Sequence, residues 1–343
     1  MFFLDYVFIG LCILLLASIR FIKPVSGFND DYLSKENCNV LRGFLVFVPP
    51  ITHLCNMGVG FNATVTNYTT VIVSVFFFFT GYGLTKQHLL KDNYSQKYFL
   101  KRLPKVVIPY ILATFIYVAV DFVFLGFLYP VSGIFNAIAC GNPVVTASWY
   151  VLHVIAFYIW FWFMMKIARK NRLLLVILAV LYYVLTTLFC MKMGWGGHWW
   201  STSFGLFVGV IWASFEKEIN VFCKNHYWIA FAAALILLLL NLFWHVNYSL
   251  IYGSMLITLV VLMMKFNLKN PVLDFLGKIS FEMYMVHGCF LIMGRCDRLY
   301  LENDAAFVTF VLGGTIIAGF AMWWIDGILV KWFDKGCKAV KLL

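Results

Sequence analysis

The amino-acid sequence predicts an all-α protein: a polytopic transmembrane helical bundle of about eleven spans. Hydrophobic residues make up 63% of the 343 residues and charged residues only 12%, whereas ordinary globular chains have roughly 45–50% and about 25%. The apolar residues form long unbroken runs, unlike the short alternating segments of a transmembrane β-barrel. This pattern excludes a soluble protein, a disordered chain and a collagen-like fibre.

Eleven apolar spans follow one another along the chain. They lie near residues 2–22, 42–58, 69–85, 106–129, 147–165, 173–190, 199–215, 227–246, 248–264, 276–294 and 305–330. The first carries Asp5 and no base before an apolar run of about twenty residues, which is too long for a signal peptide. We therefore expect it to be a retained helix.

The lysine and arginine residues predict the orientation of these spans. Of the 26 bases, 23 fall in alternate connections and the C-terminal tail, and the opposite side holds only Lys192, Arg295 and Arg298. Because basic connections stay in the cytoplasm, we expect a protein of the cell membrane with its N-terminus outside the cell and its C-terminus in the cytoplasm. Most of the net charge of +11 is then a topology signal, so membrane lipid is the expected environment and nucleic acid is not an expected partner.

The cysteines give no sign of a metal site. The nine cysteines contain no CxxC pair and no Cys/His spacing of the kind that binds metal. We interpret them as small apolar residues that fill space in membrane helices.

The second span contains the sharpest candidate site. Arg42 lies at its cytoplasmic entrance, and His53 follows after a rise of roughly 16 Å, about halfway through a core of about 30 Å. On an ideal helix the two side chains share a face within about 20°. Pro49 and Pro50 should break the helix just before His53, which is typical of a polar cavity. The alternatives are an anchoring role for Arg42 and a hydrogen bond from His53 to a neighbouring helix.

The tenth span carries a second cluster. Ser280, Tyr284 and His287 follow the i, i+4, i+7 spacing of one helix face, and His287 lies at mid-depth. A hydrogen bond between helices would also explain His287. Glu282 lies about 140° away around the helix, and we expect it to reach the cytoplasmic surface as a snorkelling side chain.

The connection over residues 86–105 is strongly basic. Lys101, Arg102 and Lys105 would suit the capture of phosphate groups, since arginine offers a bidentate fork and lysine a point charge. A solvated loop that only orients the protein is the alternative. Just before this connection, Gly81 and Gly83 would let another helix or a ligand come close.

Aromatic residues mark the predicted outer face. Trp149 and His153 lie one turn apart at the start of the fifth span, and more Trp and His residues follow at 195–200 and 244–245. An aromatic belt at the membrane interface explains most of them. A surface that stacks against a sugar is the other interpretation, with Trp149 and His153 as candidate substrate-binding residues. Ser280 of the tenth span is a third candidate substrate-binding residue.

Taken in order, these motifs resemble acyltransferase family 3, a family of polytopic membrane O-acyltransferases. The family has an arginine, ten residues and a histidine on a helix that enters from the cytoplasm, as Arg42 and His53 do here. Its phenylalanine-rich span ends in Ser-Gly-Phe, where this chain has Thr80-Gly81-Tyr82. Its Arg-x-x-Arg before Pro-Tyr is matched by Arg102 to Lys105 before Pro109-Tyr110.

The resemblance continues in the second half of the acyltransferase domain. A tryptophan that opens a central helix is matched by Trp149, and a late Leu-Gly-x-x-Ser…Tyr-x-x-His is matched by Leu276, Gly277, Ser280, Tyr284 and His287. The resemblance implies a ten-helix membrane acyltransferase domain over 35–330. An extra helix and linker over 1–34 would precede it, and a basic tail over 331–343 would follow it.

The resemblance also implies a reaction. The chain would move an acyl group, by preference acetyl, from cytoplasmic acyl-CoA to a hydroxyl of a cell-surface glycan, a lipid-linked sugar or a similar acceptor. His53 would act as general base, with Arg42, Tyr284 and His287 beside it, and the donor would bind at Lys101, Arg102, Lys105 and Arg42. No metal is implied. The alternative is a transporter or flippase that uses His53 and His287 to relay protons.

Overall fold

The computed structural model describes residues 3–21, 27–60, 69–245 and 247–339. Its helices are α1 (Phe3–Ala17), α2 (Lys35–Leu45), α3 (Val48–Asn56), α5 (Val71–Leu90), α6 (Tyr98–Arg102), α7 (Pro104–Val120), the π-helical η1 (Asp121–Leu125), α8 (Val131–Ala139), α9 (Trp149–Ala168), α10 (Arg172–Lys192), α11 (His198–Ser201), α12 (Phe204–Ser214), α13 (Glu216–Trp244), α14 (Tyr248–Met263), α15 (Pro271–Lys278), α16 (Ser280–Arg295) and α17 (Asp304–Ala339). Two short strands, β1 (Ile19–Phe21) and β2 (Phe266–Leu268), pair antiparallel.

The predicted all-α membrane bundle is confirmed, but the number of spans is not. Every predicted apolar span contains a helix. Within the described residues, however, six helices are long and apolar enough to cross a membrane, or seven if the bent pair α15 and α16 counts as one span. Helix ends also differ from the sequence prediction, because α5 continues to Leu90 and α17 to Ala339.

The break in the second span lies one turn earlier than predicted. The regular helical hydrogen-bond pattern is interrupted between Leu45 and Val48, although Val46 and Phe47 keep right-handed helical dihedrals. Pro49 and Pro50 therefore occupy the first turn of α3, and His53 lies inside regular helix. The prediction of a break just before His53 is therefore wrong. A proline lacks the N–H that would bond to the carbonyl four residues before it, so the gap opens on the N-terminal side, and proline is well tolerated in the first turn.

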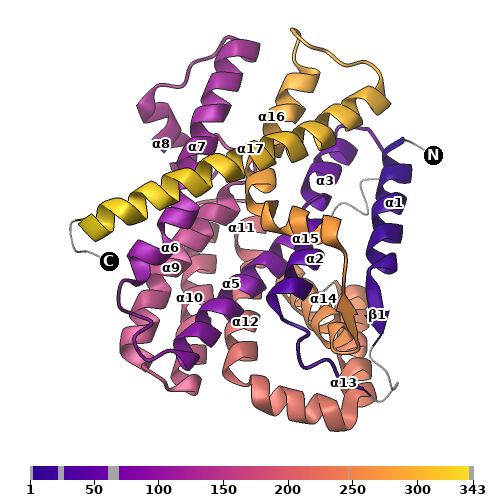
Figure 1. The fold of residues 1–343 in the computed structure, drawn as a ribbon, viewed down its shortest axis with the longest axis vertical. Coiled ribbons are helices and arrows are strands. Elements are labelled where there is room, and N and C mark those ends of the chain that lie inside the picture. Colours follow the sequence, from indigo (N-terminus) through magenta and orange to yellow (C-terminus); the bar gives the residue numbers. More distant parts are fainter. Residues whose placement is uncertain (1–2, 22–26, 61–68, 246, 340–343) are drawn as a thin grey trace.

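Small residues bring two pairs of helices into close contact. A Cβ atom on Gly81 of α5 would lie 2.3 Å from the Leu206 carbonyl oxygen of α12, and one on Gly277 of α15 would lie 1.9 Å from the Asn39 carbonyl oxygen of α2. Such contacts are possible only for glycine. Figure 1 shows α2 and α15 together near the centre, and α17 crossing the bundle obliquely. A Cβ atom on Gly83, by contrast, would have no other atom within 4 Å, and Gly83 lines a cavity.

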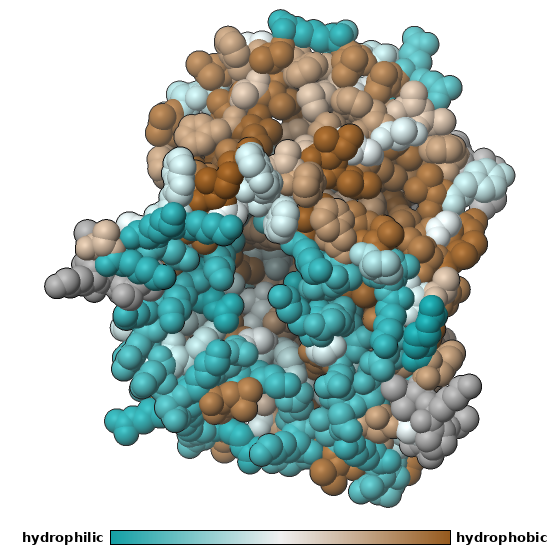
Figure 2. All heavy atoms as spheres, viewed as in Figure 1, coloured by the Kyte–Doolittle hydropathy of each residue, from teal (hydrophilic) through white to brown (hydrophobic). Residues whose placement is uncertain are grey.

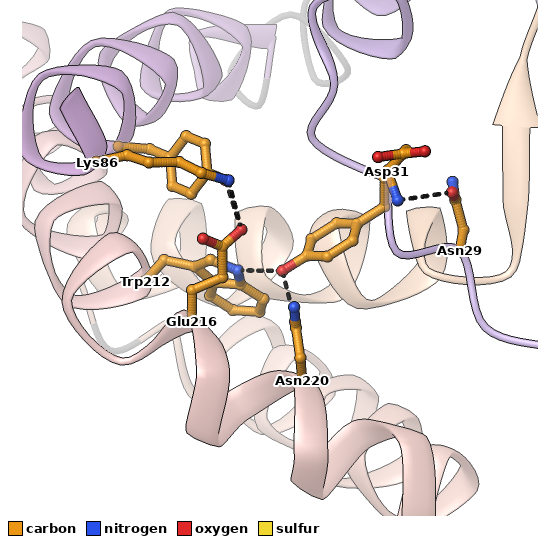
Figure 3. A network of polar contacts seen from close by, with 8 residues as sticks. Asn29, Asp31, Lys86, Trp212, Glu216 and Asn220 are labelled. Atoms are coloured by element: carbon orange, nitrogen blue, oxygen red, sulfur yellow. Dashed lines mark hydrogen bonds and ion pairs between the residues drawn. The ribbon is translucent and has the colours of Figure 1, made fainter. Parts of the chain in front are cut away.

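The N-terminal helix and its linker are packed against the rest of the bundle. The antiparallel pairing of β1 with β2 places Arg20 opposite Asn267, and α1 contacts α17 and α2. In the linker, Tyr32 is fully buried; its hydroxyl accepts a hydrogen bond from the Trp212 indole (2.8 Å) and donates one to Asn220 (2.9 Å) (Figure 3). These contacts fix the entry to α2, the helix that carries Arg42.

The surface divides into an apolar and a polar part. Figure 2 shows hydrophobic side chains over much of one face and hydrophilic side chains gathered around a hollow on the rest of it. Many large apolar side chains of α10 and α13 are exposed, such as Leu188 and Ile236. Exposed apolar surface of this extent is expected where helices face lipid.

Candidate active site

Two cavities enter the described part of the bundle toward opposite ends of the same helices. The first cavity has a volume of about 630 Å³ and is lined by Gln87 at the end of α5 and Tyr158 of α9, among others. The second has a volume of about 740 Å³ and is lined by Thr70 just before α5 and Trp149 at the start of α9, among others. Both volumes are typical of small-molecule sites.

The two cavities differ in charge. Charged side chains line the first, the basic cavity: Arg42, Arg102, Lys105, Lys278 and Glu282. Aromatic, hydroxyl and amide side chains line the second, the aromatic cavity, and no described Asp, Glu, Lys or Arg does. The basic cavity therefore suits an anionic ligand, and the aromatic cavity suits a neutral, hydroxyl-rich one.

Tyr284 and two histidines lie where the cavities approach each other. Tyr284 lines both cavities, and His53 lines the aromatic cavity. The rings of His53 and His287 stack with centres 5.4 Å apart, and the Tyr284 ring lies 5.7 Å from that of His287. The structure thus brings together three of the four side chains that the sequence nominated for chemistry.

His287, whose ring stacks against His53, is held in one orientation. It is fully buried, and its Nδ1 lies 2.6 Å from the Tyr284 carbonyl oxygen. Because a carbonyl oxygen only accepts, Nδ1 carries the proton of the neutral ring and Nε2 carries a lone pair. That Nε2 is buried and has no hydrogen-bond partner among the described residues.

The hydroxyl protons of the tenth span are already engaged. Tyr284 donates to the Ala147 carbonyl oxygen (2.8 Å), and Ser280 donates to the Gly277 carbonyl oxygen (2.9 Å) at the 75° bend between α15 and α16. By contrast, the buried Nε of Arg42 has no partner among the described residues. Arg42 thus keeps a hydrogen-bond donor unpaired beside the basic cavity.

The basic connection contributes two cations to this cavity. Arg102 and Lys105 line it, and neither forms an ion pair within the described residues. Arg102 Nε donates to the Tyr94 hydroxyl (3.1 Å), and burial raises the pKa of Tyr94 although Arg102 opposes the shift. Tyr94 therefore stays neutral at neutral pH and leaves the Arg102 charge uncompensated. Lys101 is exposed and does not line the cavity.

The comparisons with known proteins fit this geometry. A family model described as an acyltransferase domain, Acyl_transf_3, matches residues 36–325. The chain belongs to acyltransferase family 3. It is therefore a multi-pass membrane acyltransferase. No curated protein and no solved structure matches the chain.

The structure gives a role to Tyr82, which stands where the family pattern Ser-Gly-Phe has phenylalanine. The Tyr82 hydroxyl, which a phenylalanine would lack, donates to Glu216 Oε1 (2.6 Å), and Lys86 donates to the same oxygen (3.0 Å). Figure 3 shows Lys86 and Glu216 beside the Tyr32 contacts. Lys86 is thereby neutralised, so it supports the end of α5 and does not add to the charge of the basic cavity.

Of the three residues that the sequence nominated for substrate binding, His153 and Ser280 do not line the cavity that contains Trp149. His153 is buried between Phe77 (ring centres 5.5 Å apart) and Tyr182 (5.6 Å) and lines neither cavity. Ser280 lines the basic cavity, whereas Trp149 lines the aromatic one. In the aromatic cavity, Trp149 lies against His198 (5.1 Å), which the sequence placed only in the interface belt.

The prediction that Glu282 reaches the cytoplasmic surface is wrong. Glu282 is 8% exposed and lines the basic cavity, so it does not snorkel to the surface as expected. The bend between α15 and α16 turns the start of α16 into the bundle, and α17 packs over it. The spacing of Glu282 from Lys278 contains no signal for that bend.

Proposed function

We propose that this acyltransferase is an O-acyltransferase that moves an acyl group, by preference acetyl, from acyl-CoA to an acceptor hydroxyl. The acceptor would be a cell-surface glycan, a lipid-linked sugar or a similar molecule. The observation that supports this most is the pair of oppositely placed cavities, one basic and one neutral, that share Tyr284 beside His53 and His287. A donor and an acceptor could meet there without either crossing the bundle.

The basic cavity is the proposed donor site. CoA is polyanionic, and Arg102 and Lys105 offer uncompensated charge to its phosphates. Its thin pantetheine arm would then extend past Arg42 toward Tyr284, which places the thioester between the two cavities. With the orientation expected from the basic residues, this cavity opens toward the cytoplasm, where acyl-CoA is made.

The aromatic cavity is the proposed acceptor site. Trp149, Tyr248 and Tyr252 offer ring faces, and Asn56 and Asn142 offer amide hydrogen bonds. Ring faces and amides of this kind suit the apolar faces and hydroxyl groups of a sugar.

His53 is the proposed general base. Its ring takes the proton of the acceptor hydroxyl while the oxygen forms a bond to the thioester carbonyl carbon. The C–S bond then breaks and the acyl group remains on the acceptor oxygen. The CoA thiolate leaves and takes up the proton that His53 removed from the acceptor, which gives the free thiol and returns His53 to its neutral form. Arg42 supplies positive charge on the donor side, and the stacked His287 fixes the plane of the His53 ring.

The proposal is tested by mixing the purified full chain with acetyl-CoA and following release of free CoA thiol. We expect protein-dependent thiol release that rises when envelope extract is added as a source of acceptor, with labelled acetyl recovered in the glycan or lipid fraction. A transporter, the alternative reading of the buried histidines, would release no thiol and incorporate no label. That result would contradict the proposed function.

A further inference from the structure

Glu282 lies in the basic cavity without a role in the reaction outlined above. It belongs to the first turn of α16, its side chain is 8% exposed, and its Oε2 has no hydrogen-bond partner among the described residues. Asp326 of α17 is 4% exposed, its two oxygens also have no hydrogen-bond partner among the described residues, and it interacts electrostatically with Glu282. A buried carboxyl without a partner calls for an explanation, because buried polar groups are nearly always hydrogen-bonded.

The same cavity contains a hydrogen-bond donor that has no partner among the described residues. Arg42 has a buried Nε without a partner, yet no ion pair between Arg42 and Glu282 occurs in the described structure. A purely structural arrangement would bring this donor and this acceptor together, because a buried polar group without a partner is costly. A cavity that keeps a donor and an acceptor apart and unsatisfied is complementary to a ligand that carries both kinds of group.

We propose that Glu282 is a donor-binding residue that accepts a hydrogen bond from an amide N–H of the pantetheine arm of acyl-CoA. This inference rests on the proposed function. Two parts of the donor are already matched, the phosphates by Arg102 and Lys105 and the thioester end by the region of Tyr284. The arm between them carries secondary amides. The Glu282 carboxyl lines that cavity and has a buried oxygen without a partner among the described residues, so it is placed to accept from one of these N–H groups.

This assignment separates two kinds of recognition within one cavity. Arg102 and Lys105 would bind the phosphates of CoA, which pantetheine lacks. Glu282 would bind the arm, which CoA and pantetheine share. The two contributions can therefore be told apart by the ligand, without knowledge of the acceptor.

The test measures the Kd of CoA and of pantetheine for the purified full chain in detergent. Glu282→Met should weaken both ligands by the same factor, about tenfold or more, because the amide N–H of the arm loses its acceptor and is left unsatisfied in the cavity. Glu282→Gln should weaken both by less, since its amide oxygen still accepts. As matched control, Arg102→Ala should weaken CoA and leave pantetheine unchanged.

Two results would overturn the proposal. If Glu282→Met leaves both Kd values unchanged, Glu282 does not contact the ligand. If it weakens CoA alone, Glu282 acts through the phosphate end. A Kd does not depend on the fraction of protein that folds, and the Gln variant preserves the shape of the side chain. Normal binding of CoA without any acyl transfer would instead contradict the proposed function and leave the assignment of Glu282 intact.

Discussion

Replacement of His53 by alanine is expected to lower the rate of acyl transfer by at least about a hundredfold, since general acid–base groups contribute about 100- to 10,000-fold. His53 lines the aromatic cavity and forms no hydrogen bond from its ring to another described residue, so its lone pair is available to an acceptor hydroxyl. The KM for acyl-CoA should change little, because the donor binds in the other cavity. The measurement is kcat and KM on purified protein.

The chain offers a matched control for this variant. His153 is also a buried intramembrane histidine, but it packs between Phe77 and Tyr182 and lines neither cavity. His153→Gln should therefore keep kcat within about tenfold of the wild type, the limit below which we assign no chemical role. A loss below tenfold for His53→Ala would return His53 to a structural role.

Reversal of charge at Arg102 should strongly raise the KM for acyl-CoA, by about tenfold or more. The residue lies at a wet surface, so the effect depends on salt: the Debye length falls from about 10 Å at 0.1 M to about 3 Å at 1 M. Arg102→Glu should accordingly show a weaker salt dependence of KM than the wild type. The apparent affinity for the acceptor should remain unchanged. Arg102→Lys should do less harm, because it keeps the charge and loses only the fork.

Lys101 provides the control for Arg102. It is adjacent in sequence and equally charged, but it is exposed and does not line the basic cavity. If the connection only orients the protein during insertion, Lys101→Glu and Arg102→Glu should both reduce the amount of inserted protein and leave KM alone. An unchanged KM per inserted molecule for Arg102→Glu would remove the docking role.

The fold class was predictable from the sequence because it follows from local properties. Long apolar runs predict helices whatever their neighbours are, and each predicted span contains one. The number of membrane crossings did not follow in the same way. It depends on how long each helix is, since α1 and α14 are shorter apolar helices, and on bends such as the 75° turn before Ser280.

The candidate site was predictable only in part. His53, Tyr284 and His287 could be nominated because polar groups at mid-depth stand out in an apolar chain. Their mutual contact, and the division of the nominated residues between two cavities, arise from the packing of distant helices. His153 shows the same limit. It follows Trp149 by one turn, yet α5 and α10 enclose it, and sequence spacing does not encode that enclosure.

The central claim is that donor and acceptor enter from opposite faces and meet at Tyr284 and His53. Sealed membrane vesicles of both orientations test this, with orientation fixed by protease access to a tag on the C-terminus and labelled acetyl-CoA supplied in the medium. Acetyl-CoA does not cross the bilayer, so the account predicts label in the glycan or lipid fraction only where the C-terminal tail faces the medium, and background in His53→Ala vesicles. Equal incorporation in both orientations, or incorporation only in the opposite one, would contradict it.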